Sequence, residues 1–428
     1  MDVNATNLTE DPTMYPGSIK AYTSSVNLFS LPETDVSTLK SGEFQPFFPQ
    51  VSLRENFNPL DFIITSESSS YIDLSESYLA VTARIMRQDG AKCLATDKVA
   101  PCNLFFQAMF SNAEIYLNGK WFPLKNFNFG QPSRTLKFFV TGTLLSDTSN
   151  LYPYVGYLQR VLTSSPLEKQ HSLQEEFYYP NVTPDTYTTG TAGDAGFNKR
   201  WEMTKESKEF SMVGQIVSNI TTQNRYVVGG QQLRIILRRS QPEFCLDSAT
   251  KTIDTYTGVP WKFDITSAVF FACKRQMAPK ILDLHRSMSA RSPYMYPVTE
   301  MQSRTIGIPS GVSSHSSEAI INGKIPRMLV LGIISQTAFH GALDKSPFNF
   351  QNWDLKEVTF SLNSETLDTR VIPLSFSKNN SGTDDYLQAL RNLRKCAANQ
   401  LLGNGIDKNS FKSGIVPHGY LVFILLLF

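Results

Sequence analysis

The chain has 428 residues, a length that suggests two or three domains of about 150 residues each and a core large enough to need no disulfides or metals. Its net charge of +2 argues against the strongly basic domain that is usual in nucleic-acid-binding proteins. Charged residues make up only 18% of the chain and aromatic residues 12%, which favours strands over helices and a surface that other subunits cover.

Targeting and redox signals are weak along the whole chain. The five cysteines are scattered and form no C-x-x-C pair, so the sequence predicts neither a disulfide framework nor a zinc site. The N-terminus lacks a basic-then-apolar signal segment, and no stretch has the roughly 18 apolar residues of a membrane span. We therefore expect a protein with reduced thiols that assembles inside the cell and is not secreted through a signal peptide.

Residues 1–43 are polar and have little periodicity, which predicts an extended N-terminal arm. Strand signals begin at residue 44. Apolar residues at alternate positions, or short apolar runs between turn residues, predict strands at 60–64, 71–74 and 79–86.

The stretch 103–122 predicts a β-hairpin. Ala113, Ile115 and Leu117 alternate with polar or amphipathic residues, as in a half-buried strand. Asn118-Gly119 follows, the pair best suited to a tight type I′ turn, and residues 120–122 would then form the returning strand.

A similar pattern recurs later in the chain. Val358, Phe360 and Leu362 alternate before Asn363-Ser364, and Asn363 lies 245 positions after Asn118. Upstream, Pro347-Phe348-Asn349 matches Pro101-Cys102-Asn103 at an offset of 246. Two landmarks at nearly one offset indicate one architecture used twice, with chance as the alternative. Ser364 suits a tight turn less well than Gly119, so the second hairpin is the weaker prediction.

Between these hairpins, apolar residues spaced by three and four predict a short helix at 151–162. Residues 163–208 are polar and rich in turn residues, and strands are predicted at 212–217 and 232–238. Residues 247–258 are expected to form a linker between two domains, 44–246 and 259–428.

The second half repeats the style of the first. A strand is predicted at 265–273, and the continuous apolar run 328–334 predicts a strand buried on both faces. A leucine stripe predicts a helix at 384–402, with Thr383 as its cap and Gly403 as its stop. Many short strands, long connections and few helices predict an all-β fold of two sandwiches.

No catalytic, cofactor-binding or metal-ligating residue is predicted. The five histidines form no H-x-H or H-E-x-x-H motif, which argues against a metal-centred jelly roll of the cupin type. There is no G-x-S-x-G motif and no P-loop. Gly190, Gly193 and Gly196 lack the strand-to-helix context of a dinucleotide site. Ser316 beside His315 is attributed to chance in a serine-rich loop, so no enzyme is expected.

Short runs in collinear order carry a resemblance to a known family. They are 71–79 (YIDLSESYL), 99–103 (VAPCN), 115–120 (IYLNGK), 152–158 (YPYVGYL), 229–237 (GGQQLRIIL), 243–245 (EFC), 325–332 (IPRMLVLG), 338–341 (AFHG), 346–350 (SPFNF) and 404–407 (NGID). Together they span about residues 44–423 and resemble the hexon-like major capsid proteins of Polinton/Maverick elements and adintoviruses.

This resemblance implies two consecutive jelly-roll β-sandwiches, with a few short helices in the connections. It also implies a homotrimer forming a pseudo-hexagonal capsomer in a virion. Its partners would be neighbouring capsomers and a single jelly-roll penton or minor capsid protein, with no specific nucleic acid and no membrane span. The alternative is a non-assembling β-sandwich binding module for a glycan or receptor; a hydrolase has only scattered serines and histidines in its favour.

The resemblance ends near residue 423. Gly419-Tyr420 and Phe423 match a family strand, but residues 424–428 do not continue as the family does. The second jelly roll is therefore expected to be truncated, by decay of the element or by a frame error.

Overall fold

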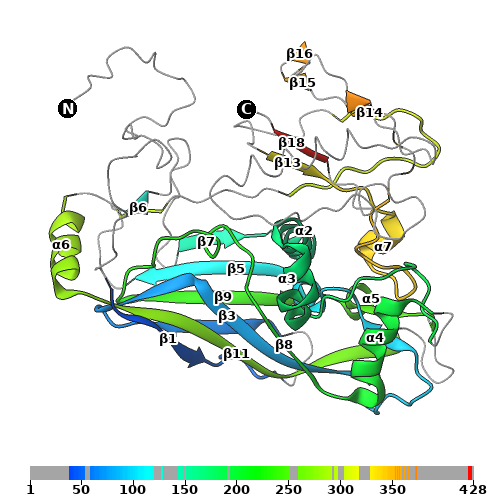
Figure 1. The fold of residues 1–428 in the computed structure, drawn as a ribbon, viewed down its shortest axis with the longest axis horizontal. Helices are drawn as coiled ribbons and strands as arrows, with labels where there is room; N and C mark the ends of the chain where they lie inside the picture. The colour runs from blue at the N-terminus through cyan, green and yellow to red at the C-terminus, as the bar shows by residue number, and fades with distance from the viewer. Residues whose placement is uncertain are drawn as a thin grey trace.

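The computed structural model gives the fold of the chain (Figure 1). The described residues are 38–53, 58–119, 127–128, 143–148, 150–189, 193–250, 259–291, 294–296, 303–317, 328–351, 353, 355, 357–358, 361–362, 365–366, 372–373 and 423–426.

Two four-stranded antiparallel sheets form a β-sandwich. One sheet has the order β1 (Thr38–Phe47), β11 (Trp261–Met277), β3 (Ser70–Arg87) and β8 (Phe210–Gly214). The other has the order β2 (Leu60–Thr65), β9 (Gln231–Arg239), β5 (Phe110–Gly119) and β7 (Thr143–Asp147).

The order of these eight strands defines a jelly roll. Numbered along the chain, the first sheet contains the first, eighth, third and sixth strands, and the second sheet contains the second, seventh, fourth and fifth. The chain therefore changes sheet at every step except between the fourth and fifth strands, which are neighbours, as in the two Greek keys of a jelly roll. The predicted fold class is confirmed as all-β with antiparallel sheets and short helices in the connections, and a double jelly roll is consistent with it.

Short elements connect the strands. They are β4 (Val99–Pro101), α1 (Phe105–Ala108), β6 (Phe127–Asn128), α2 (Tyr152–Thr163), α3 (Pro166–Gln170), the 3₁₀ helices η3 (Ser172–Glu176) and η4 (Lys205–Ser207), α4 (Ala195–Thr204), α5 (Pro242–Cys245), β10 (Leu246–Ser248), α6 (Pro279–Ser289) and β12 (Tyr294–Met295). Further along lie β13 (Met328–Leu331), α7 (Gln336–His340), β14 (Glu357–Val358), β15 (Ser361–Leu362), β16 (Glu365–Thr366), β17 (Ile372–Pro373) and β18 (Phe423–Leu426).

The predicted domain boundaries need correction. Strand β11 pairs with β3 from Trp261↔Arg87 to Gln276↔Ser70, so the first sandwich extends to Met277 and not only to residue 246. Residues 247–248 belong to β10, which pairs with β4, instead of a linker, while 251–258 lie outside the described residues. Strand β1 begins inside the predicted arm 1–43. An apolar strand pattern shows that a strand is buried, but not which sheet it enters.

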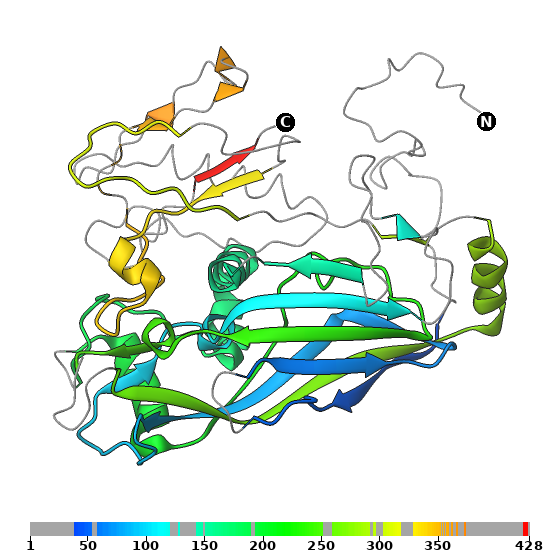
Figure 2. The ribbon, with the colours of Figure 1, turned by 180° about the vertical axis from the view of Figure 1, so that it is seen from behind.

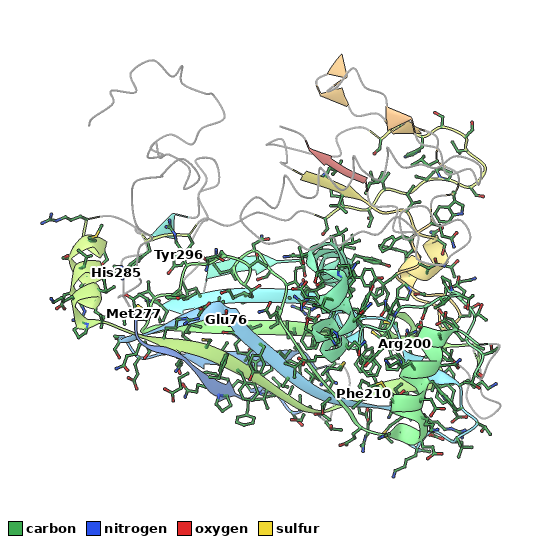
Figure 3. All side chains as sticks on the ribbon, in the orientation of Figure 1. Glu76, Arg200, Phe210, Met277, His285 and Tyr296 are labelled. Carbon is green, nitrogen blue, oxygen red and sulfur yellow. The ribbon has the colours of Figure 1, made fainter. Side chains whose placement is uncertain are left out.

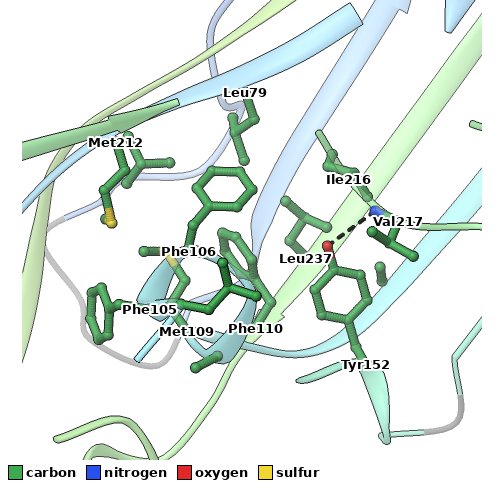
Figure 4. Close-up of a cluster of buried hydrophobic side chains, with 14 of the residues drawn as sticks. Leu79, Phe105, Phe106, Met109, Phe110, Tyr152, Met212, Ile216, Val217 and Leu237 are labelled. Atoms are coloured by element: carbon green, nitrogen blue, oxygen red, sulfur yellow. Dashed lines mark hydrogen bonds between the residues drawn. The ribbon is translucent and has the colours of Figure 1, made fainter. Parts of the chain in front are cut away.

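Period-two burial generates the core. In β9 the side chains of Leu233, Ile235 and Leu237 are fully buried while the alternate positions are half-exposed, as their spacing predicts. Rings from α1 and β5 fill the space between the sheets, and Phe106 meets Phe110 edge to face at 6.2 Å (Figure 4). Tyr152 closes this cluster, and its hydroxyl accepts a 3.3 Å hydrogen bond from the Val217 amide.

The predicted hairpin at Asn118-Gly119 is wrong. Strand β5 runs through both residues, and Asn118 pairs with Gln232 of β9. Its other edge pairs with β7, with Leu117 opposite Thr143. Both hydrogen-bonding edges of residues 115–117 are thus occupied by β9 and β7, and residues 120–122 lie outside the described residues. The weaker hairpin does form, because Leu362 of β15 pairs with Glu365 of β16 across a two-residue connection.

Other predicted elements are confirmed or shifted. The helix predicted at 151–162 is confirmed as α2. Tyr157 and Val161 are buried on it, whereas Val155 is only partly buried. The strands predicted at 71–74 and 79–86 are one strand, β3. Leu329–Leu331 are half-buried, not buried on both faces, because β13 has one described neighbour, β18. The helix predicted at 384–402 lies outside the described residues.

Candidate functional site

Side chains that could bind a metal or act as nucleophiles are dispersed over the described residues. No group of three or more His, Cys, Asp or Glu side chains in this part of the chain could hold a metal ion. Four cysteines (Cys93, Cys102, Cys245 and Cys273) are buried, and burial raises the pKa of each thiol, which makes the thiolate scarce. His315 lies in an exposed loop. Within the described ranges, no helix has the length and apolar character to span a bilayer.

The glycine patch has a packing role at the start of α4. A Cβ at Gly193 would overlap the carbonyl oxygen of Thr188, and one at Gly196 would overlap that of Pro180. Only glycine allows the backbone to approach so closely. Gly190 lies outside the described residues.

The most elaborate polar arrangement surrounds Arg200, which is fully buried on α4. Its Nε donates to the Pro101 carbonyl at 2.7 Å, and its Nη2 donates to Asn181 Oδ1 at 2.6 Å. The same Nη2 lies 2.9 Å from Asp247 Oδ2, and Nη1 donates to the Tyr179 carbonyl. One guanidinium thus joins α4, β4, β10 and the 179–181 segment.

The carboxyl of Asp247 is equally buried. Burial raises its pKa from 3.8 to about 6, although the Arg200 charge and hydrogen bond act in the opposite direction. Its Oδ1 has no hydrogen-bond partner among the described residues. Asp194 stabilises the N-terminus of α4, because it accepts a 2.8 Å hydrogen bond from the Phe197 amide and caps the helix. We interpret this network as a structural brace.

A second buried acid, Glu176, stabilises the junction of α1 and η3. Gln107 Nε2 donates to its Oε2 at 2.8 Å, and Arg160 forms an ion pair with its Oε1. Tyr152 donates to Gln107 Oε1 at 2.6 Å. A Cβ at Gly156 would lie 2.9 Å from that oxygen, so glycine is required there. Burial raises the pKa of Glu176.

The opposite end of the sandwich carries helix α6. The Tyr71 hydroxyl lies 2.9 Å from His285 Nδ1, and burial raises the pKa of Tyr71 to about 12, so the phenol keeps its proton. Figure 3 shows His285 and Arg200 at opposite ends. The Tyr71–His285 contact and the Arg200 network are therefore too far apart to form one functional site.

An aromatic joint connects the first sandwich to residues 336–350. It is formed by Tyr154, Tyr157, Phe244, Phe339, Phe348 and Phe350. Tyr157 of α2 stacks on Phe348 with centroids 4.1 Å apart and an interplanar angle of 6°. Tyr154 stacks on Phe339 of α7 at 5.5 Å and 11°. Edge-to-face contacts from Phe244 and Phe350 complete the cluster.

Polar contacts fix the orientation of this joint. Asp185 accepts from the Ser346 amide at 2.8 Å and from Asn349 Nδ2 at 3.2 Å, and it pairs with Lys345 at 3.3 Å. The Ser248 amide donates to the Leu343 carbonyl at 2.6 Å. The arrangement holds residues 336–350 against the first sandwich in one orientation.

The outer face of the β2-β9-β5-β7 sheet is a ladder of paired charges. Arg234 Nη2 lies 2.6 Å from Asp61 Oδ2, and Arg238 Nε lies 2.8 Å from Glu114 Oε1. The Tyr116 hydroxyl also donates to Glu114, at 2.7 Å. The arginine side chains are exposed and shield the acids, so this face is polar and internally satisfied.

The outer face of the β1-β11-β3-β8 sheet carries an apolar, aromatic patch. Tyr78 stacks on Phe271 at 5.0 Å and contacts Phe44 at 5.3 Å. Phe44 is 44% exposed, and Phe48, directly after β1, is 64% exposed. This surface was not predicted from the sequence. Its signal was the run 44–49, in which apolar residues occupy both alternating positions of one strand.

Comparisons with known proteins found partial similarities. No protein-family model matches the chain. The Caenorhabditis elegans protein named "Uncharacterized protein F54H12.2" is 22% identical over 377 residues, which are 87% of this chain and 81% of that protein.

Three solved viral structures are also similar. They are the Faustovirus major capsid protein (9% identity, TM-score 0.31), the mavirus major capsid protein (12%, 0.30) and a chain of the Sputnik virophage (10%, 0.33). The similarity covers 60%, 63% and 61% of this chain, but only 58%, 54% and 53% of theirs. TM-scores this low support no conclusion, so the fold assignment rests on the strand order of this chain.

Proposed function

We propose that this chain is the structural subunit of a viral shell, a hexon-like major capsid protein of a Polinton/Maverick- or adintovirus-type DNA element. Three chains would form a pseudo-hexagonal capsomer in the virion. Two jelly rolls in each of three chains approximate a six-fold outline with three-fold symmetry, and such capsomers tile a flat facet.

The observation that carries this proposal is the complete jelly-roll strand order of the first sandwich. The collinear resemblance over residues 44–423 supports the same class. The later strands support a second sandwich. β13 lies 245 positions after residues 83–86 of β3, and it pairs antiparallel with β18 as β3 pairs with β11.

The joint between the halves suits a rigid shell subunit. Stacked rings and the Asp185 contacts fix residues 336–350 on the first sandwich. A capsomer needs this rigidity, because neighbouring capsomers and a single jelly-roll penton or minor capsid protein would have to meet surfaces in fixed positions.

Expression of the full chain, followed by mass measurement and negative-stain microscopy, tests the proposal. We expect particles of three times the 48.1 kDa chain mass, with three lobes. A monomer that stays monomeric at tens of micromolar concentration would contradict it. If that monomer also bound a glycan on an array, the alternative of a β-sandwich binding module would replace it.

A further inference from the structure

We infer that the outer face of the β1-β11-β3-β8 sheet is the surface through which one copy of the chain contacts a second copy. We call it the aromatic face and define it by Phe44, Tyr78, Ala80, Val213, Val269 and Phe271. The inference rests on the proposed function as a self-assembling subunit, and it names the contact surface.

The strand register assembles these side chains into two rows. Val269 of β11 lies opposite Ala80 of β3, which lies opposite Val213 of β8. In the adjacent row, Phe271 lies opposite Tyr78, and their rings are stacked. Neighbouring strands thus place small aliphatic side chains beside rings in a continuous patch.

Polar and charged groups border this patch instead of interrupting it. Thr82 and Ser211 hydrogen-bond to each other at 3.0 Å on one side. Beyond them, Arg84 approaches Glu209 and Asp264 at 4.0 and 3.9 Å. An apolar, aromatic centre within a polar rim is the usual anatomy of a protein–protein interface.

The outer surface of this sheet is large enough for a stable interface. Its strands have 10, 17, 18 and 5 residues. With about 3.3 Å per residue and about 4.8 Å between strands, the whole outer surface, the aromatic face together with its polar border, measures roughly 800 Å². A standard interface buries about 800 Å² on each partner.

The position of the face makes a second copy the occupant. Both views show β13 and β18 beyond the β2-β9-β5-β7 sheet, on the side opposite β1 and β11 (Figures 1 and 2). Strands β13 and β18 of the second half therefore lie away from the aromatic face and leave it uncovered. A contact from this face to a different surface of the next copy is heterologous and closes into a ring when three copies meet.

The first test replaces Phe44 by glutamate in the full chain. A carboxylate buried in an interface is unfavourable, so we expect the dissociation constant of the assembly to rise at least about 30-fold while the separate chain stays folded. Leu167→Glu is the matched control, because Leu167 is 66% exposed on α3 and lies outside the face. It should leave assembly unchanged.

The second test needs no destabilising change. A photo-crosslinking phenylalanine analogue placed at Phe48 should give covalent dimers whose cross-links map to another copy, while the same analogue at Leu167 should give none. If the Phe44→Glu variant assembles as well as the unaltered chain, and the analogue at position 48 gives no cross-link, this inference is overturned and the proposed function stands. A chain that never assembles would overturn both.

Discussion

Two Arg–Asp pairs in the first sandwich have the same chemistry in opposite environments. Arg200 and Asp247 have side chains 0% and 1% exposed and lie 2.9 Å apart. Arg234 and Asp61 lie 2.6 Å apart, but the arginine is 42% exposed. The first pair closes a network between loops at one end, whereas the second is one rung of a ladder on an outer face.

The difference shows which polar contacts the fold depends on. Removal of two charges from water costs several kcal/mol for each ion, and the buried pair offsets this cost only while every partner is present. The exposed pair gives up little hydration and gains little. The end of the sandwich should therefore be intolerant of change, and the polar face should be tolerant.

The largest expected effect is at Arg200. Arg200→Met leaves Asp247 buried without a cation and leaves the Pro101 carbonyl without its donor. We expect a loss of about 3–5 kcal/mol in the free energy of unfolding. Urea denaturation followed by tryptophan fluorescence measures it, because Trp201 lies on the same helix.

A double variant identifies the source of that loss. Arg200→Met combined with Asp247→Leu removes both charges, and it should recover about 2 kcal/mol or more relative to Arg200→Met alone. If the double variant is no more stable than the single one, the unpaired carboxylate is not the cause.

The next effect is a pH dependence of stability that arises from the carboxyl of the buried pair. The folded chain holds the Asp247 proton up to about pH 6, whereas the unfolded chain releases it near 3.8. Between these values a rise in pH favours the unfolded state. This carboxyl should therefore lower the free energy of unfolding by about 3 kcal/mol between pH 3.5 and 7.

Asp247→Asn keeps an acceptor for Arg200 but has no titrating proton. Stability should then fall less steeply over the same pH range, when both chains are unfolded in urea at pH 4, 5, 6 and 7. Identical pH profiles for the two chains would show that Asp247 titrates at its usual value.

Much of the first sandwich could be predicted from the sequence, because strand alternation is a local signal. The spacing of Leu233, Ile235 and Leu237 identified a buried strand face correctly. The turn at Asn118-Gly119 failed because the partner of β5 returns only at Thr143, and that long-range pairing outweighs a favourable turn pair. For the same reason, the sheet to which β11 belongs could not be predicted.

The candidate sites were less predictable than the fold. Arg200 lies in a polar region without periodicity, and its burial depends on Pro101, Asn181 and Asp247, which are far apart in the sequence. Phe44 and Phe271 face outward only because of the register of β1 and β11. Their exposure is a property of the assembled sheet. The composition of the chain shows only a general excess of aromatic residues and does not show which of them face outward.

The smallest expected effect is at the exposed pair. Arg234→Met should change the free energy of unfolding by at most about 1 kcal/mol, because Asp61 lies on the outer face, where water can replace the exposed arginine, and the charge ladder retains Arg238. The change should shrink further in 0.5 M salt, which screens exposed charges. A loss comparable to that of Arg200→Met would mean that the polar face is covered in the assembled protein, and the contrast between the two pairs would then disappear.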